Sequence, residues 1–354
     1  MKTFIRSAAC ISPQKTFGKD GFLTDVVEYN TTRLHTIEPN YTEYIDPKQA
    51  RRMSHNIKMG VTTAKACLEK AGVTMPGAII TGTAYGCVDD TVTFLTRMIE
   101  MKEDLLPPTA FIQSTHNTVA AQVALMLQCH NYNSTFVHKG ISFQSALHDG
   151  LMLLKEGEAN DILVGGIDEL NSAAYTVLGR LGVYKRWPLS NLSLFETKTN
   201  GTIGGEGAAF FMLTDKPSPD NLAELKGIQN FFKPKDSDVI EQKITAFLSR
   251  QGLTIDDIDL IITGKNGDIK NDAIYGSLET SLFKNKALAN YKHLCGEYPT
   301  STAFALWLAS NIIKKGVVPE VVKQDGVSNN QPKKVLVYNH YFNTYHSLML
   351  VVAN

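Results

Sequence analysis

The segment STFVHKGISFQSAL (residues 134–147) has the sequence pattern of a strand, a tight turn and a buried helix. In many enzymes the first helical position after such a turn carries an exposed nucleophile. Here Gly140 occupies that position, and glycine has no side chain. The segment therefore predicts the framework of a reactive site from which the reactive group is missing.

Three other side chains could supply a nucleophile. Ser142 lies two residues after the glycine, but a serine at a helix start usually caps the helix, so we expect an N-cap. Cys129 precedes a histidine, yet adjacent residues on a helix end point in different directions. Cys295 lies near His293, and the two could share a face if the segment is extended. We expect both cysteines to be buried core residues.

The composition of the chain argues against several functional classes. Its 354 residues contain 35 basic and 35 acidic side chains, so no excess charge indicates nucleic acid or an anionic membrane as a partner. The five cysteines have no metal-ligand spacing, and their odd number argues against a disulfide framework. The stretch GTIGGEG lacks the Lys-Ser/Thr pair of a phosphate-binding loop, so we expect a turn of the fold there. We therefore expect no metal and no cofactor.

The N-terminal sequence MKTFIRSAAC predicts the first β-strand. Arg6 interrupts its apolar residues, and it lacks the apolar stretch of about 7 to 15 residues that a signal peptide needs. No apolar run approaches the roughly 18 residues of a transmembrane helix. We expect a cytoplasmic protein with reduced thiols.

Apolar periodicity predicts alternating helices and strands. Between residues 53 and 68 apolar side chains recur every three or four positions, which indicates an amphipathic helix that stops at Gly72. Residues 77–86 predict a buried strand, and residues 117–128 are apolar almost all round, which predicts a buried helix. We expect further strands at 134–138, 161–169 and 206–214, and a helix at about 142–156. The alternation predicts an α/β fold with a central sheet flanked by helices.

The second half of the chain repeats features of the first. Residues 71–90 and 251–272 both follow a helix, contain Ile-Ile-Thr-Gly and precede a helix. The strand pair that begins with DILVGG has a counterpart in the pair that begins with KVLVYNH. Two matched pairs in the same order indicate an internal duplication. We predict halves at 1–214 and 223–354, joined by the Pro- and Asp-rich link 215–222.

The duplicated chain resembles the thiolase-like fold, and its details resemble the β-ketoacyl synthase branch of that fold. The similarity spans nearly the whole chain. RRMSHNIKMGVTTAKACLEKAG resembles the family's early helix, and DILVGGIDEL resembles the strand after its nucleophile helix. NGTIGGEGAAFFMLT resembles its Gly-Glu-Gly-Ala strand, and STAFALWLASNIIKKGVVP resembles the helix after its second histidine. The resemblance implies a layered αβαβα fold with two mixed five-stranded sheets around buried helices.

The resemblance also implies a chemistry, a decarboxylative Claisen condensation. A cysteine at a helix N-terminus carries the acyl chain as a thioester, two histidines stabilise the enolate, and a lysine supports them. Matched by motif, Gly140 stands at the cysteine position, Asn266 at the first histidine and Glu297 at the second. Lys292 is retained. A carboxylate at position 297 would oppose an enolate and could instead pair with Lys292. The resemblance therefore implies no catalytic residue, and leaves open whether the chain is an enzyme.

The family's glycine-rich loop before the last strand is also altered. Its counterpart here is NHYFNTYHS (339–347), which contains no glycine. Since three catalytic positions and one loop depart from the family together, a single misaligned residue does not account for the pattern.

Inactive members of this family, called chain-length factors, pair with an active synthase and limit the length of its product. The resemblance implies that the strand at 134–138 joins the two subunits and that the segment 107–122 lies near the partner's acyl tunnel. Four residues are the candidates for the tunnel and the dimer interface: Phe111, Ile112, Thr135 and Val137. The motifs PPTAFIQSTHNT and SFQSALHDG further resemble partner subunits of aryl-polyene and flexirubin-type pigment pathways.

Two functional hypotheses follow from the resemblance. In the first, the chain is a catalytically silent subunit that pairs with an active synthase, or with a second copy of itself, and meets acyl carrier protein through its partner. In the second, it is an active 3-oxoacyl carrier-protein synthase or acyltransferase that uses Ser142, Cys129, Cys295 or non-covalent transfer.

Overall fold

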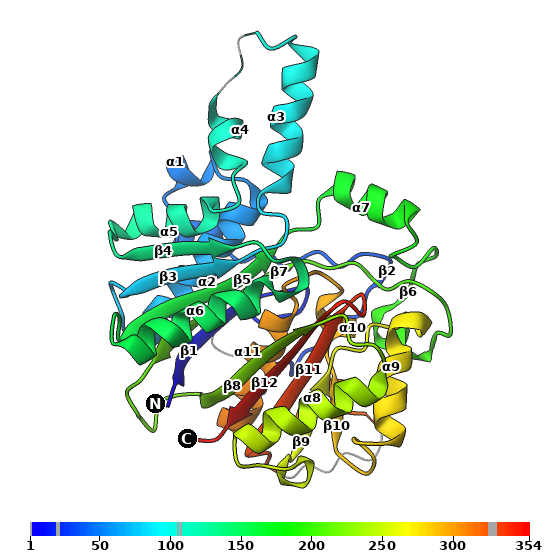
Figure 1. Cartoon of the computed structure of the whole chain (residues 1–354). Helices are drawn as coiled ribbons and strands as arrows, with labels where there is room; N and C mark the ends of the chain where they lie inside the picture. The colour runs from blue at the N-terminus through cyan, green and yellow to red at the C-terminus, as the bar shows by residue number, and fades with distance from the viewer. Residues whose placement is uncertain (1, 19–21, 105, 107, 325–330) are drawn as a thin grey trace.

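The computed structural model describes residues 2–18, 22–104, 106, 108–324 and 331–354 of the chain. Its largest feature is a mixed sheet of ten strands built from two groups of five (Figure 1). The first group is β1 (Phe4–Ile11), β3 (Ala78–Gly82), β4 (Tyr132–Phe136), β5 (Asp161–Asp168) and β7 (Gly207–Thr214). The second is β8 (Ala223–Phe232), β9 (Leu260–Thr263), β10 (Leu288–Asn290), β11 (Lys334–Tyr341) and β12 (Tyr345–Val352).

The two groups have the same internal order. From the shared border outward, the first runs β1, β7, β5, β3, β4, and the second runs β8, β12, β11, β9, β10. In both groups the two outermost pairings are parallel and the two innermost are antiparallel. Only Phe4 and Ile5 of β1 pair with β8, so the groups are two five-stranded sheets joined at a short seam. This topology confirms the predicted fold of two mixed five-stranded sheets.

Helices lie on both sides of each sheet, in five layers. The central layer contains α6 (Ser142–Glu156) and α11 (Thr302–Lys315), whose buried residues share one core with both sheets. The helices α2 (His55–Ala71) and α5 (Thr118–Leu127) pack on the outer face of the first sheet. On the outer face of the second sheet lie α8 (Ser237–Arg250) and α9 (Ile269–Thr280). The chain therefore has the αβαβα layering expected of a thiolase-like protein.

Most predicted elements lie where the sequence places them. The helix predicted to stop at Gly72 ends at Ala71, and Gly72 caps it with a φ of +64°. The first strand begins at Phe4, while Met1 lies outside the described residues. The strand predicted at 134–138 runs instead from Tyr132 to Phe136, so Val137 and His138 belong to the following turn.

The prediction that residues 117–128 form a fully buried helix is wrong for one face. In α5 only Thr118, Val119, Ala120 and Val123 are buried, and the side chain of Leu125 is 70% exposed. The sequence is apolar on both faces, but α5 packs against α2, β3 and β4 through one face, and Leu125 lies on the other.

A helical arm extends from the first half of the chain (Figure 1). It consists of α3 (Val88–Glu100), which has no buried residue, and the short α4 (Pro108–Gln113). The predicted segment 107–122 begins at Pro107, which lies outside the described residues. The arm exposes a set of large apolar side chains, namely Leu95, Ile99, Phe111 and Ile112.

The remaining α-helices and strands are short. They are α1 (Pro47–Ala50), α7 (Ser172–Arg180), α10 (Lys292–Cys295) and a two-stranded ribbon of β2 (Asn30–Thr31) and β6 (Leu189–Ser190). All four residues of α10 are buried. Among the described residues, no helix is both long and apolar enough to cross a membrane. Residues 215–222 connect β7 to β8, and we propose 1–214 and 223–354 as the two halves of a duplicated chain.

Candidate functional site

Gly140 lies in a 3-10 turn (Lys139–Ile141) that leads from β4 into α6. The residue before it, Lys139, has a φ of +49°, so the turn is tight even without a glycine at that position. A Cβ atom added at Gly140 would lie 2.3 Å from Cβ of Tyr341 and 2.8 Å from its Cγ. Such distances are far shorter than a van der Waals contact, so Tyr341 occupies the space that any side chain at position 140 would need.

Tyr341 is the last residue of β11 and comes from the second half of the chain. It is buried, and its hydroxyl lies 3.5 Å from the hydroxyl of Tyr85. Burial raises the pKa of Tyr341 well above its usual value, and the nearby Tyr85 and Glu297 act in the same direction. Tyr341 is therefore a neutral phenol that fills space, and it cannot act as an anionic nucleophile near neutral pH.

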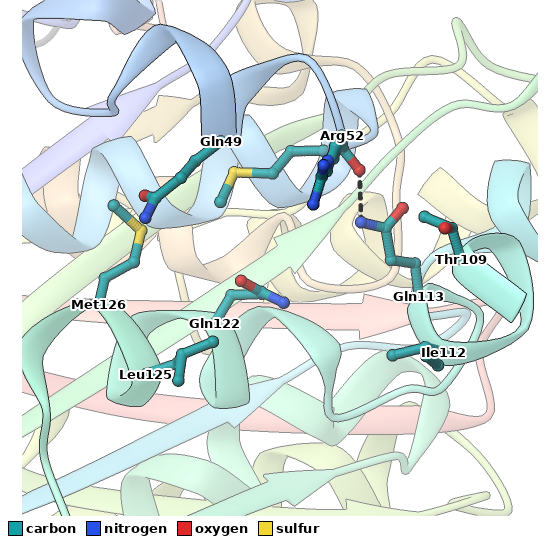
Figure 2. Close-up of a pocket in the computed structure, with 9 residues that line it drawn as sticks. Gln49, Arg52, Thr109, Ile112, Gln113, Gln122, Leu125 and Met126 are labelled. Carbon is teal, nitrogen blue, oxygen red and sulfur yellow. Dashed lines mark hydrogen bonds between the residues drawn. The ribbon is translucent and has the colours of Figure 1, made fainter.

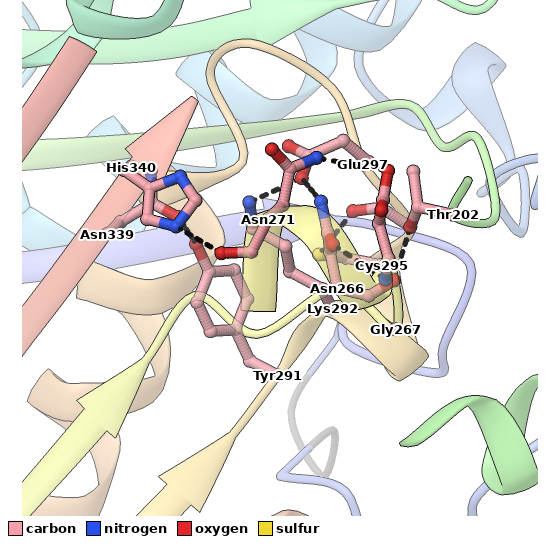
Figure 3. A network of polar contacts seen from close by, with 12 residues as sticks. Thr202, Asn266, Gly267, Asn271, Tyr291, Lys292, Cys295, Glu297, Asn339 and His340 are labelled. Atoms are coloured by element: carbon pink, nitrogen blue, oxygen red, sulfur yellow. Dashed lines mark hydrogen bonds and ion pairs between the residues drawn. The ribbon is translucent and has the colours of Figure 1, made fainter. Parts of the chain in front are cut away.

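Asn266, Lys292 and Glu297 form one buried polar network (Figure 3). Glu297 Oε2 accepts a hydrogen bond of 2.7 Å from Asn266 Nδ2 and forms an ion pair of 2.6 Å with Lys292 Nζ. Its other oxygen, Oε1, has no hydrogen-bond partner among the described residues. The pairing expected between Lys292 and Glu297 is thus present, and both residues are almost completely buried.

A carboxylate fixes the turn that carries Asn266. Asp272, in the first turn of α9, accepts hydrogen bonds from the backbone amides of Asn266 (2.9 Å) and Gly267 (2.8 Å). Burial raises its pKa to about 6. Thr202 donates a further hydrogen bond of 2.6 Å to the Asn266 carbonyl. The segment GKNGDIKND is therefore a well-fixed turn between β9 and α9 that aims the Asn266 amide at Glu297.

The stretch GTIGGEG packs against the turn that carries Glu297. A Cβ atom on Gly205 would lie 2.0 Å from the carbonyl oxygen of Cys295, so only glycine allows the two backbones to approach. The Glu297 amide donates to Ile203 O, and the Gly205 amide donates to Glu297 O. The stretch is an extended segment fixed by these contacts, with isolated β-bridges at Thr202 and Gly204, where the sequence predicted a turn.

The segment 339–347 forms the hairpin between β11 and β12. Phe342 and Asn343 both have a φ of +50°, so the turn keeps a left-handed backbone without glycine. Next to it, burial lowers the pKa of His340 well below its usual value, and its Nε2 lies 3.0 Å from the Asn271 carbonyl. His340 is therefore a neutral residue within the polar network of Figure 3.

Ser142 is not the N-cap that its position predicts. Its hydroxyl accepts a hydrogen bond of 2.8 Å from the His138 amide and donates one of 2.8 Å to the Lys139 carbonyl. The hydroxyl bridges the turn before α6, because Ser142 already lies inside the helix and Ile141 takes the cap position. The His138 ring instead lies 2.9 Å from the Ser145 hydroxyl, so Ser142 has no imidazole base.

Both candidate cysteines are buried, as predicted. The thiol of Cys129 points to the Pro76 carbonyl at 3.7 Å. Burial raises the pKa of Cys295 well above its usual value, and its thiol contacts the Gly296 carbonyl at 3.3 Å. His293 lies 2.9 Å from the Val321 carbonyl. Neither thiol has the base or the exposure that a nucleophilic cysteine needs.

The four residues predicted at the tunnel and the dimer interface lie at the surface of the first half. On α4 the side chains of Phe111 and Ile112 are 56% and 62% exposed, and Val137 is 41% exposed just beyond β4. Thr135 forms a hydroxyl pair of 2.9 Å with Thr81 on β3. Because β4 is an edge strand of the sheet, one row of its backbone groups is open to a further strand. Their role in an interface stays a prediction.

Sequence reasoning missed a surface pocket beside the arm. It has a volume of about 280 Å³ and lies between α1, α4 and α5 (Figure 2). Ile112, Leu125 and Met126 give it an apolar part, while Arg52 and Gln122 line it with polar groups. Gln113 donates a hydrogen bond to the Arg52 carbonyl and so ties the base of α4 to the body. Among the described residues, no group of three or more His, Cys, Asp or Glu side chains is arranged to hold a metal ion.

Comparisons with known proteins identify the family of the chain. Residues 31–218 match the family described as "Beta-ketoacyl synthase, N-terminal domain". No curated protein matches the chain significantly. Because the family match covers more than half of the chain, the chain belongs to the β-ketoacyl synthase family.

Several solved structures share the fold over the full length of the chain. "The ishigamide ketosynthase/chain length factor" is 16% identical with a TM-score of 0.84, and covers 100% of this chain and 99% of that one. A β-ketoacyl synthase from Burkholderia phymatum STM815 is 14% identical with a TM-score of 0.78 and the same coverage. A third, "AntDE:AntF (apo): type II PKS acyl-carrier protein in complex with its ketosynthase bound to the hexaketide", is 14% identical with a TM-score of 0.75, again covering 100% and 99%. At these identities the matches show the fold alone.

Proposed function

We propose that the chain is a catalytically silent β-ketoacyl synthase homologue that pairs with an active synthase and shapes its acyl tunnel. One observation carries this proposal: Tyr341 fills the space beside Gly140. In an active member, that space would hold the cysteine that carries the acyl chain. Here the position has no side chain, and the backbone and the ring from the second half are packed so that none fits. The loss is therefore built into the packing of the chain.

The second and third altered positions support the same proposal. A condensing site needs groups that stabilise a developing negative charge on the substrate. At the corresponding place this chain has the carboxylate of Glu297, held by Lys292 and Asn266. The Lys292 ammonium is directed to Glu297, so it is not available to a substrate carbonyl. Lys292 and Glu297 therefore form a structural ion pair, and Asn266 donates a hydrogen bond to it.

The surface of the first half supports a protein partner. The edge strand β4, the exposed Val137 beyond it and the apolar side chains of α4 and α5 lie on this half. Monomeric proteins rarely leave such apolar groups together and uncovered. We propose that an active synthase covers them, and that Phe111 and Ile112 contribute to its tunnel. The description of the ishigamide protein names a ketosynthase together with a chain length factor, which is the kind of pair proposed here.

The finer parts of the proposal concern the partners and the pathway. We propose that acyl carrier protein is bound through the active subunit, that the pair is cytoplasmic, and that the pathway is of the aryl-polyene or flexirubin type. The description of the AntDE:AntF complex contains an acyl carrier protein bound to a ketosynthase. A homodimer of this chain is the alternative assembly.

Co-expression with a candidate active synthase, followed by size-exclusion chromatography, tests the pairing. We expect the two chains to elute together in equal amounts. The purified pair is then loaded with radiolabelled acyl carrier protein, and the subunits are separated under denaturing conditions. We expect label on the synthase alone. A stable ester or thioester on this chain would refute catalytic silence. If this chain forms only homodimers when it is co-expressed with each synthase tested, the heterodimer is refuted.

A further inference from the structure

We infer that a surface cavity between β1, α2 and the link 215–222 binds a phosphate group. The cavity has a volume of about 410 Å³ and lies away from Gly140 and the network around Glu297. Its lining brings together three cationic side chains, from Arg6, Lys70 and Lys216, and the hydroxyl groups of Thr214 and Ser218. No family residue discussed above takes part in it, so this inference does not depend on the proposed function.

A β-bulge places Arg6 in the cavity. In the pairing of β1 with β7, Ile5 lies opposite Leu213 and Ser7 opposite Met212, so Arg6 is the extra residue between them. A bulge redirects the side chain of its extra residue and is a common device near binding sites. The Arg6 guanidinium makes one long ion-pair contact of 3.4 Å, to Asp161, which leaves most of its N–H groups free for a ligand.

Lys70 and Lys216 approach the cavity from two other elements. Lys70 lies in the last turn of α2, and its ammonium contacts the Ala8 carbonyl at 3.4 Å. A lysine at a helix C-terminus also stabilises the helix dipole, so Lys70 alone would not indicate a ligand. Lys216 lies outside any helix, and within the described part of the chain its ammonium has no hydrogen bond or ion pair. The convergence of three elements on one cavity is what indicates an anion.

The charge balance of the cavity favours an anion. Its lining contains three cations and one carboxylate, that of the exposed Asp220, and Asp161 beside Arg6 adds a second carboxylate, so one positive charge remains. Partial burial lowers the pKa of Lys70, and an anion beside it would stabilise its charged form. Arginine and lysine together, with hydroxyl donors, are the groups that proteins use to bind phosphate.

The volume of the cavity favours a small phosphorylated molecule over a free phosphate ion. Sites for small organic ligands have volumes of about 300 to 1,000 Å³, and this cavity falls in that range. A free phosphate ion would leave much of it filled with water. We therefore expect a small phosphorylated molecule to bind more tightly than inorganic phosphate.

Isothermal titration calorimetry on the full chain at low salt tests the inference, with inorganic phosphate and glycerol 3-phosphate as probes. We expect saturable binding of one equivalent, tighter for glycerol 3-phosphate. Lys216→Gln should weaken binding at least tenfold, and Arg6→Gln should weaken it similarly. Lys216 is exposed, so its variant keeps the fold even where a change at the bulge residue would disturb it.

Lys48→Gln is the matched control, because Lys48 is an exposed lysine on α1 that does not line the cavity. It removes the same charge and should leave both affinities unchanged. The inference is wrong if neither probe binds saturably, or if Lys48→Gln weakens binding as much as Lys216→Gln. If inorganic phosphate binds more tightly than glycerol 3-phosphate, the site is supported and its ligand is the free ion. None of these outcomes bears on pairing with a synthase.

Discussion

The contact between Gly140 and Tyr341 gives a sharp test of the packing on which catalytic silence depends. A Cβ atom at Gly140 would lie 2.3 Å from Tyr341 Cβ, 2.8 Å from Cγ and 3.0 Å from Cδ1. Overpacking of this kind costs about 1–3 kcal/mol of unfolding free energy. Gly140→Ala should therefore lower the urea midpoint without changing the slope of the transition.

Two changes at Tyr341 show which of its atoms cause the destabilisation of Gly140→Ala. Tyr341→Ala removes the ring but keeps Cβ, the atom nearest to the added methyl group. Tyr341→Gly removes both. Each single change costs about 3–5 kcal/mol or more, because a buried aromatic ring is lost. The added penalty of Gly140→Ala should persist in the Tyr341→Ala background and disappear in the Tyr341→Gly background.

Gly276→Ala provides the control for this cycle. Gly276 lies within α9, and an added Cβ there meets no atom within 4 Å. Alanine in a helix interior is favoured over glycine by about 0.5–1 kcal/mol, so this variant should be more stable than the parent. Equal penalties for Gly140→Ala in all three Tyr341 backgrounds would refute the claim that Tyr341 excludes a side chain at this position.

Four further predictions concern the site, the buried carboxyl of Glu169 just after β5, and the interface. Glu297→Gln should lower the free energy of unfolding by about 3–5 kcal/mol because it leaves the Lys292 ammonium buried without its counter-ion. The double variant Lys292→Met with Glu297→Leu should cost less, because no charge stays buried. Urea unfolding measures both variants, and a costlier double variant would contradict the reasoning. Burial raises the pKa of Glu169 to about 7, so the native state keeps a proton that the unfolded state loses and stability falls as the pH rises from about 4.5 to 7. Glu169→Gln should therefore gain stability relative to the parent across that interval in thermal melts, and a constant difference would count against it. Val137→Lys should abolish co-elution with the synthase while changing the unfolding free energy by no more than about 0.5 kcal/mol, and retained co-elution would exclude this surface from the interface. Gly140→Cys should remain unlabelled by radioactive acyl carrier protein, since Tyr341 occupies the place of the thiol; a labelled chain would show that the ring can move aside.

The sequence predicted those features that depend on local chemistry. Apolar side chains at helical spacing and a following glycine predicted the helix that ends at Ala71, because both signals act within a few turns of backbone. The pairing of Lys292 with Glu297 was likewise predictable, since the two lie on either side of one turn. The layered fold followed from the resemblance to the β-ketoacyl synthase family, whose motifs occur in order along nearly the whole chain.

Features that depend on distant neighbours were not predictable in this way. Leu125 has the sequence signal of a buried residue, but its exposure depends on what covers the outer face of α5. Ser142 has the type and position of an N-cap, yet the tight turn at Lys139 offers its hydroxyl a different amide. The helix α3 has apolar side chains at helical spacing and no buried residue, so its amphipathic pattern indicates a surface that the chain covers only in part, where Phe94 packs on Phe111 of α4.

The place of Tyr341 explains how the second half can fill the space beside Gly140, where we propose that the family's cysteine is missing. Gly140 precedes the central helix of the first half, while Tyr341 ends the strand of the second half that corresponds to β5. These two ends meet at the centre of the fold, since both sheets pack on the same helical layer. A cavity left at Gly140 would cost stability, and the other half contacts the turn that carries Gly140 through Tyr341 and β12. Under the proposed function, the tyrosine at the end of β11 packs the position of the family's cysteine, and we propose that the chain thereby keeps the shape of a synthase without its chemistry.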